Sequence, residues 1–205
     1  MMHVRTRSVE ATRQVAAALE PILLPGDVIL LSGDLGAGKT AFVQGLAAAL
    51  GVTEQVTSPT FTLAASYEGR LRLHHLDVYR LDNLAEVLDL DLPELLEDHA
   101  TICIEWGEVV VPELPRDFLR IRIQLGHLED IDDARVLEIE PIGPSWVSRK
   151  QKLEEAWKDW TTAETGDLYH ARTRHRNSHS TSRSRHRGSR RSHSLIPYSQ
   201  RPTSC

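Results

Sequence analysis

The chain has 205 residues, of which 40% are hydrophobic and 26% are charged, as expected for one globular domain with some excess length. No apolar stretch approaches the ~18 residues of a membrane span, and the N-terminus lacks the apolar core of a secretory signal. We therefore expect a cytoplasmic protein that does not associate with membranes. All 29 acidic residues precede Ala171, whereas nine of the 24 basic residues, all Arg, follow it. The acidic first part argues against tight binding of a nucleic-acid backbone by this part alone.

The first predicted element is a helix that begins after Ser8, a residue type favoured at helix N-caps. Glu10 lies in its first turn, where a negative charge is favourable, and the helix is expected to end near Pro21 to Pro25. Its apolar face consists of Val15, Ala18, Leu19 and Ile22. We expect this helix to cover one side of a site formed by the glycine-rich segment that follows.

That segment, Gly33 to Thr40, matches the phosphate-loop pattern G-x-x-x-x-G-K-[ST] at every fixed position. The apolar run Val28 to Leu31 before it predicts a buried strand, and Ala41 to Leu50 after it predict a helix that Gly51 ends. Strand, loop and helix thus occur in the order that the motif requires. The alternative is a glycine-rich turn that binds nothing, and the agreement between motif and context argues against it.

The spacing of this loop has a chemical reason. Its three glycines allow successive backbone N–H groups to turn toward a phosphate at the positive end of the following helix. Lys39 is placed to reach the β- and γ-phosphates, and the Thr40 hydroxyl is placed to coordinate Mg²⁺. The predicted phosphate-binding residues are Gly33, Asp34, Leu35, Gly36, Ala37, Gly38, Lys39 and Thr40.

Ser58 and Thr60 flank a proline in a loop that leads toward the next strand. Pro59 fixes its own φ and favours an extended Ser58, so that both hydroxyls are presented in a defined way. Two interpretations remain open: a Ser/Thr-rich loop, or a switch segment that a γ-phosphate and its metal order.

A hairpin is predicted over residues 64–76, with its turn at residues 68–69 and Asp77 at the end of the return strand. An acid in this position either lies beside Mg²⁺ and a catalytic water or caps the following turn. His74 and His75 are adjacent and face opposite ways on a strand, so we expect no shared zinc ion.

The leucine-rich, acidic stretch Leu84 to His99 predicts one or two short helices interrupted by a proline. The apolar strand predicted next, residues 100–104, carries Cys103 as an expected core residue and leads into Glu105 and Trp106. In phosphate-loop enzymes an acid at this point lies beside the bound Mg²⁺, so Glu105 is the preferred metal-side or water-positioning residue. Trp106 is either a packed aromatic or a wall of the site.

Two further strands, Phe118 to Leu125 and Arg135 to Ile142, complete the predicted sheet. From its surroundings alone, Arg135 is expected to pair with the aspartates just before it. The order of strands and helices predicts an α/β fold of the P-loop NTPase type, in which flanking helices cover a mainly parallel central sheet with antiparallel additions.

Composition predicts three regions along the chain. Residues 1–143 form the P-loop domain, and residues 144–170 form a helical extension whose apolar positions include three tryptophans. Residues 171–205 are rich in Arg, Ser and His with few aliphatic residues, and are expected to be a disordered tail. The tail is either a nucleic-acid-binding segment or incidental, and its composition favours the second.

Four motifs together resemble the bacterial TsaE family in order and spacing, over roughly Ser8 to Ile142. They are Gly33-Asp34-Leu35-Gly36-Ala37-Gly38-Lys39-Thr40, Ser58-Pro59-Thr60-Phe61-Thr62-Leu63, His75-Leu76-Asp77-Val78-Tyr79-Arg80 and Ile104-Glu105-Trp106. The resemblance implies an ATP- and Mg²⁺-dependent ATPase that assists synthesis of N6-threonylcarbamoyladenosine at position 37 of tRNAs reading ANN codons. It also implies TsaD and TsaB as protein partners, with tRNA reached only through their complex.

The same resemblance implies roles for individual residues. The phosphate loop binds ATP, and the metal ligands are Thr40 and Glu105. The implied catalytic residues are Lys39, Asp77 and Glu105, and either of the two acids remains a candidate for positioning the water. The other implied nucleotide-site residues are Thr12, Ser58, Thr60, Trp106 and Arg135, with Ser58 and Thr60 in the switch segment.

Two other functions stay open at this point. A small-molecule kinase uses the same loop, but the stretch 84–99 contains no Arg of the kind that a kinase lid usually supplies. In a nucleotide-dependent assembly module, nucleotide occupancy would govern assembly and hydrolysis would not be required.

Overall fold

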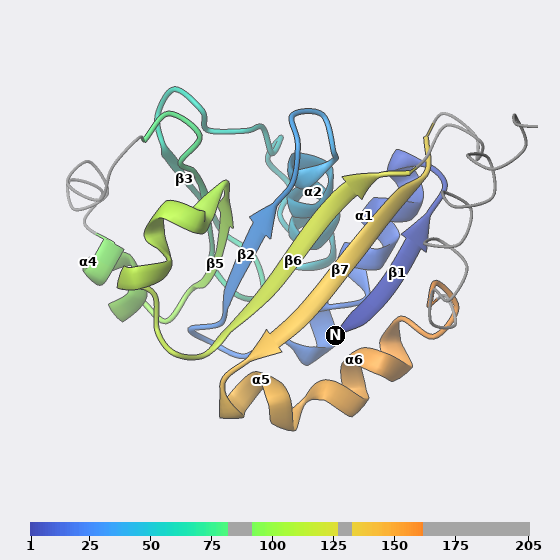
Figure 1. Ribbon diagram of the computed structural model, residues 1–205. Coiled ribbons are helices and arrows are strands. Elements are labelled where there is room, and N and C mark those ends of the chain that lie inside the picture. Colours follow the sequence, from blue (N-terminus) through green and yellow to red (C-terminus); the bar gives the residue numbers. More distant parts are fainter. Residues whose placement is uncertain (82–91, 127–132, 162–205) are drawn as a thin grey trace, which may run out of the picture. The chain divides into compact units, whose positions relative to one another are not determined.

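The computed structural model describes residues 1–81, 92–126 and 133–161. Seven strands form one sheet in the order β1-β7-β6-β2-β5-β4-β3 (Figure 1). The four central strands β6, β2, β5 and β4 are parallel, and β1, β7 and β3 are joined by antiparallel pairing. The strands are β1 Met2–Thr6, β2 Val28–Ser32, β3 Ala64–Tyr67, β4 Leu73–Asp77, β5 Thr101–Glu105, β6 Phe118–Leu125 and β7 Arg135–Ile142. The predicted α/β fold with a parallel centre and antiparallel additions is confirmed.

Helices lie on both faces of this sheet. Their bounds are α1 Val9–Ala17, η1 Glu20–Ile22, α2 Lys39–Ala49, α4 Leu92–Glu97, η2 Gly107–Glu113, α5 Pro144–Ser148 and α6 Lys150–Ala156. In Figure 1, α1 and α2 lie behind the sheet and η2 lies in front of it. Two apolar clusters correspond to the two faces, and β2 contributes Ile29 and Leu31 to one and Val28 and Leu30 to the other. Successive side chains of a strand point to opposite faces, so a strand covered on both sides is apolar throughout.

The N-terminal helix begins as predicted, because the Ser8 hydroxyl accepts a hydrogen bond from the backbone N–H of Ala11 at 3.0 Å. The preceding strand β1 was not predicted. Its buried residues Met2, Val4 and Thr6 alternate with partly exposed ones, which is the periodicity of an edge strand with one buried face.

The hairpin of β3 and β4 is confirmed, although its return strand begins at Leu73, later than the expected residue 70. The predicted helical stretch from Leu84 lies partly outside the described residues. Its described part, α4, contains Pro93 in its first turn, where a missing N–H costs no helical hydrogen bond.

The expected helix after residue 143 is divided in two, α5 and α6, at Arg149 with φ −93° and ψ 1°. Trp146, Leu153 and Trp157 from these helices are fully buried in the same apolar cluster as α1 and α2. The Trp157 indole N–H donates to the backbone carbonyl of Val15 at 2.8 Å. These helices therefore contribute directly to the core beside α1. No helix within the described ranges is both long and apolar enough to cross a bilayer.

Candidate functional site

The candidate site lies at the edge of the sheet where the parallel strands β2, β4 and β5 end. The glycine-rich loop connects the end of β2 to the first residue of α2, Lys39. Asp77 and Glu105, the last residues of β4 and β5, are direct neighbours in the strand register. Ligand sites of parallel α/β sheets form at this edge, because the connecting loops and helix N-termini gather there.

Three glycines in the loop have a positive φ: Gly33 (+131°), Gly36 (+78°) and Gly38 (+110°). L-amino acids rarely adopt such angles, whereas glycine, which has no Cβ, adopts them readily. A Cβ on Gly33 would also collide with the backbone carbonyl oxygen of Ile123. The backbone thus follows a path that requires glycine, and it lies at the N-terminus of α2, where N–H groups suit an anion.

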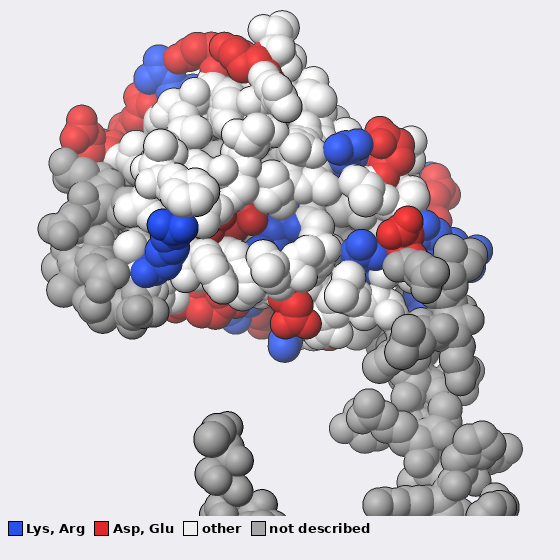
Figure 2. Space-filling view, turned by 90° about the horizontal axis from the view of Figure 1, so that it is seen from above, with Lys and Arg blue, Asp and Glu red and all other residues white. Residues whose placement is uncertain are grey.

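Lys39 is only 4% exposed, and its ammonium lies inside the loop. Its Nζ donates to the backbone carbonyls of Gly33 at 2.8 Å and Asp34 at 2.9 Å, and lies 3.7 Å from the centroid of the Trp106 ring. Burial lowers the pKa of Lys39, and the negative charges of Glu105 and Asp77 act in the opposite direction. In Figure 2, which faces this edge, a few acidic and basic atoms lie in a hollow among uncharged side chains.

Glu105 is buried, with 3% of its surface exposed, and receives two hydrogen bonds on the same oxygen. Its Oε1 accepts from the Thr40 hydroxyl at 2.8 Å and lies 2.9 Å from Nε2 of His75. A hydroxyl and a carboxylate held together beside a phosphate-type loop are the oxygen ligands that Mg²⁺ prefers. The residues present therefore fit a magnesium ion in this position.

Asp77 connects the segment around Pro59 to the sheet. Its Oδ2 accepts hydrogen bonds from the hydroxyls of Ser58 and Thr60, the latter at 2.7 Å. Its Oδ1 accepts from the backbone N–H of Tyr79 at 3.1 Å. Asp77 thus caps the following turn, which is one of the two interpretations predicted for it, and it also lies beside Glu105 in the strand register.

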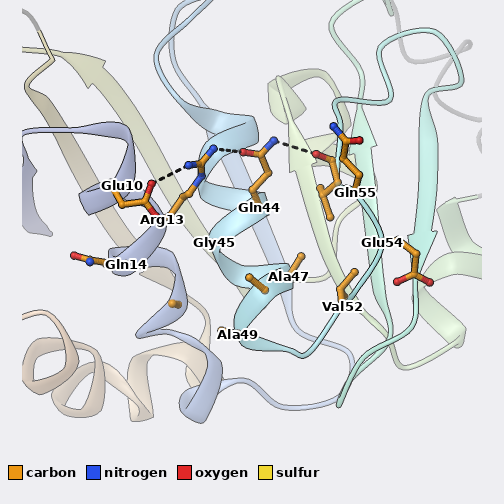
Figure 3. A pocket seen from close by; sticks show the side chains of 13 residues that line it. Glu10, Arg13, Gln14, Gln44, Gly45, Ala47, Ala49, Val52, Glu54 and Gln55 are labelled. Carbon is orange, nitrogen blue, oxygen red and sulfur yellow. Dashed lines mark hydrogen bonds and ion pairs between the residues drawn. The ribbon is translucent and has the colours of Figure 1, made fainter.

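A second groove, about 510 Å³ in volume, lies between α1, α2 and residues 52–56 (Figure 3). Its side chains form a hydrogen-bond chain in which Arg13 donates to Gln44 at 2.9 Å and Gln44 donates to the carbonyl of Val56 at 3.0 Å. Val56 lies two residues before Ser58. This chain attaches the residues just before the predicted switch segment to α2.

Trp106 has a left-handed backbone with φ +62°, and its ring contacts Lys39 and Tyr79, with the Tyr79 and Trp106 centroids 4.8 Å apart. It is partly exposed, and it both packs against Tyr79 and borders the loop. Trp106 is therefore a packed aromatic residue that also lies beside the glycine-rich loop.

Thr12 and Arg135 reach the loop from other elements. Thr12 is buried, bonds the hydroxyl of Thr6 at 2.9 Å, and has its methyl 3.9 Å from the position of a Cβ on Gly38. Arg135 donates from Nε to the carbonyl of Ala37 at 3.0 Å and lies 3.8 Å from the carboxylate of Asp133. Arg135 thus makes the predicted aspartate pair and also contacts the loop.

His75 is the residue at this site that the sequence interpretation missed. The prediction considered His75 as a zinc ligand shared with His74, rejected that role, and gave it no other. The available signal was its position two residues before Asp77, because residues i and i+2 of a strand share a face. Its contact with Glu105 on the neighbouring strand needed the register of β4 and β5.

The fold and the loop define an α/β protein with a phosphate-loop motif between its first parallel strand and the following helix. The protein-family model described as "Threonylcarbamoyl adenosine biosynthesis protein TsaE" matches residues 6–134, and the chain belongs to this family. The family assignment from the four motifs is thereby confirmed.

Similar proteins agree with this assignment. The Bacillus subtilis protein named tRNA threonylcarbamoyladenosine biosynthesis protein TsaE is 39% identical over 140 residues, covering 68% of this chain and 85% of its own length. The protein of that name from Treponema pallidum is 44% identical over 124 residues, covering 60% of this chain and 92% of its own length. The crystal structure of Bacillus subtilis YdiB matches with a TM-score of 0.64 and 33% identity, covering 75% of this chain and 94% of that one.

Proposed function

We propose that this chain binds ATP and Mg²⁺ at the loop of residues 33–40 and hydrolyses the ATP in support of threonylcarbamoyladenosine modification of tRNA. The observation that carries the proposal is the joint placement of Lys39, Thr40 and Glu105 around a loop whose backbone requires glycine. Family membership supports the pathway, because the matching family is described by this biosynthesis.

Each group has a defined task in this proposal. The backbone N–H groups of the loop and the Lys39 ammonium bind the phosphate oxygens, and Lys39 exchanges its two carbonyl contacts for them. Thr40 and Glu105 hold Mg²⁺, which neutralises negative charge on the β- and γ-phosphates when bound. Thr12, Trp106 and Arg135 border the nucleotide. The carboxylates of Asp77 and Glu105, in register on neighbouring strands, orient the attacking water.

The hydrogen bonds of Ser58 and Thr60 to Asp77 support a switch at residues 58–61. Nucleotide occupancy shifts this segment between two arrangements, and we propose that the TsaD and TsaB proteins respond to it in the cytoplasm. Residues 1–170 contain more acidic than basic residues, and this excess of negative charge fits a protein that reaches tRNA through such a complex.

The test compares Lys39→Ala with Lys150→Ala, a half-exposed lysine of α6 that carries the same charge. Removing Lys39 is expected to weaken ATP binding about 10- to 100-fold, the usual loss for a hydrogen bond to a charged group. Calorimetry measures the affinity, and release of phosphate from labelled ATP measures turnover. Lys150→Ala should match the unmodified chain.

Three outcomes would contradict parts of the proposal. Equal ATP affinity of Lys39→Ala and the unmodified chain would remove the nucleotide site from this loop. A labelled organic product in place of free phosphate would indicate a kinase. Normal tRNA modification in cells that carry only a hydrolysis-deficient, ATP-binding Glu105→Gln variant would indicate an assembly module.

A further inference from the structure

His75 is a fully buried polar residue whose side chain contacts the candidate magnesium ligand Glu105. It lies on β4 and shares its face of the sheet with Asp77, while Glu105 lies on the adjacent β5. The exposed fraction of His75 is 0%, and that of Glu105 is 3%. A hydrogen bond that is shielded from water is strong, and losing it leaves a buried polar group unpaired at a cost in free energy.

The contact with Glu105 defines which ring nitrogen of His75 donates. Glu105 Oε1 is a carboxylate acceptor, so Nε2 at 2.9 Å must carry the hydrogen and donate it. Among the described residues, Nδ1 of His75 has no hydrogen-bond partner. The imidazole therefore makes one polar contact in the described part of the chain, and that contact is to Glu105.

The same oxygen of Glu105 also accepts the Thr40 hydroxyl at 2.8 Å. Two donors from different elements, α2 and β4, thus fix the position of Oε1, and the described residues place no donor on Oε2. The rotation of the carboxylate is set by these two bonds. Without His75, Thr40 alone would hold it.

We propose that His75 is a positioning residue that holds the Glu105 carboxylate in the orientation needed to bind Mg²⁺ together with Thr40. The proposal rests on the proposed function of the loop. Partners that orient a metal ligand typically change metal affinity 10- to 100-fold when removed. His75 itself touches neither nucleotide nor metal in this assignment.

The neighbouring His74 provides a matched control. It is also buried, with 5% exposed, and its ring bonds Ser66 at 2.8 Å and the Asp98 carboxylate at 3.0 Å. Its contacts face away from Glu105, because adjacent residues of a strand point to opposite sides. Loss of His74 removes a partly buried histidine–carboxylate contact without touching the candidate site.

The experiment measures ATP affinity by calorimetry in EDTA and in excess Mg²⁺, in the unmodified chain and in variants at the two histidines. For His75→Leu we expect an unchanged affinity in EDTA, within about twofold, and an about tenfold smaller gain from Mg²⁺. His75→Gln should retain most of the gain, because its amide nitrogen reaches the place of Nε2. His74→Leu should show the full gain, even with a lower melting temperature.

If His75→Leu does not fold, His75→Asn replaces it, since its amide is one bond too short to reach Oε1. A full Mg²⁺-dependent gain in His75→Leu or His75→Asn would overturn the positioning role while leaving the proposed function intact. Equal losses in His75→Gln and His75→Leu, or in His74→Leu, would assign the effect to packing and overturn it as well. An unmodified chain that gains no affinity from Mg²⁺ would instead overturn the proposed function, and this inference with it.

Discussion

At the scale of single residues, Trp106 has the least expected backbone at the site. A left-handed conformation is unfavourable for a bulky side chain and costs on the order of 1–3 kcal/mol. Its N–H donates to the carbonyl of Leu31 at 2.9 Å, which joins the end of β5 to β2 beside the glycine-rich loop. The left-handed backbone of Trp106 places its ring beside the Lys39 ammonium. The strained residue therefore makes a contact inside the candidate site.

Cys103 provides the first prediction at this scale. Burial between the helices and the sheet raises the pKa of its thiol, so less thiolate exists at any given pH than for an ordinary cysteine. In a Cys205→Ser variant, we expect the native thiol to react with a thiol reagent more than about 100-fold slower than in denaturant at pH 8. Absorbance of the released chromophore follows the reaction, and equal native and denatured rates would show that Cys103 is accessible.

At the scale of elements, the contact between α1 and α2 depends on Gly45. A Cβ on Gly45 would collide with the backbone of Arg13, because the two helices approach closely there. In an open helix position Gly→Ala stabilises by about 1 kcal/mol. We expect Gly45→Ala to lower the free energy of unfolding by about 1–3 kcal/mol instead, because it overpacks the interface. Denaturant titration measures the change.

The exposed Ala48 on the same helix supplies the comparison. Ala48→Gly should cost about 1 kcal/mol through helix propensity alone. If Gly45→Ala proved more stable than the unmodified chain, the close approach of the two helices would be wrong.

At the scale of the whole described chain, a buried ion pair joins the C-terminal helices to the start of β2. Arg149 donates to the two carboxylate oxygens of Asp27 at 2.6 and 2.7 Å, and both residues are less than 10% exposed. Arg149→Met leaves the Asp27 charge buried without this partner, so we expect the unfolding free energy to fall by about 3–5 kcal/mol. Thermal and denaturant unfolding measure the loss.

The partly exposed pair of Arg120 and Glu140, 3.0 Å apart, provides the control for this prediction. Arg120→Met should change stability by less than about 1 kcal/mol, because water reaches and screens this pair. If Arg149→Met lowers the unfolding free energy no more than Arg120→Met does, the buried pair does not stabilise the domain as predicted.

Much of the fold and of the candidate site follows from local patterns. The strand Val28–Ser32, the glycine-rich loop and the start of α2 at Lys39 are contiguous, so motif and periodicity predict them together. The strands over 118–125 and 135–142 were predicted at their observed bounds. Their alternation of apolar and polar residues is a local property that needs no partner to be recognised.

Only the tertiary structure shows the strand order, and with it which side chains meet. The contact of His75 with Glu105 requires β4 to lie next to β5, and the contact of Arg135 with Ala37 joins residues 98 positions apart. The Arg149–Asp27 pair spans 122 positions and makes the C-terminal helices part of the core. Such contacts depend on how whole elements pack, and this packing leaves no periodic pattern in the sequence of either segment. The phosphate-loop motif can be recognised in the sequence because one continuous backbone turn forms it.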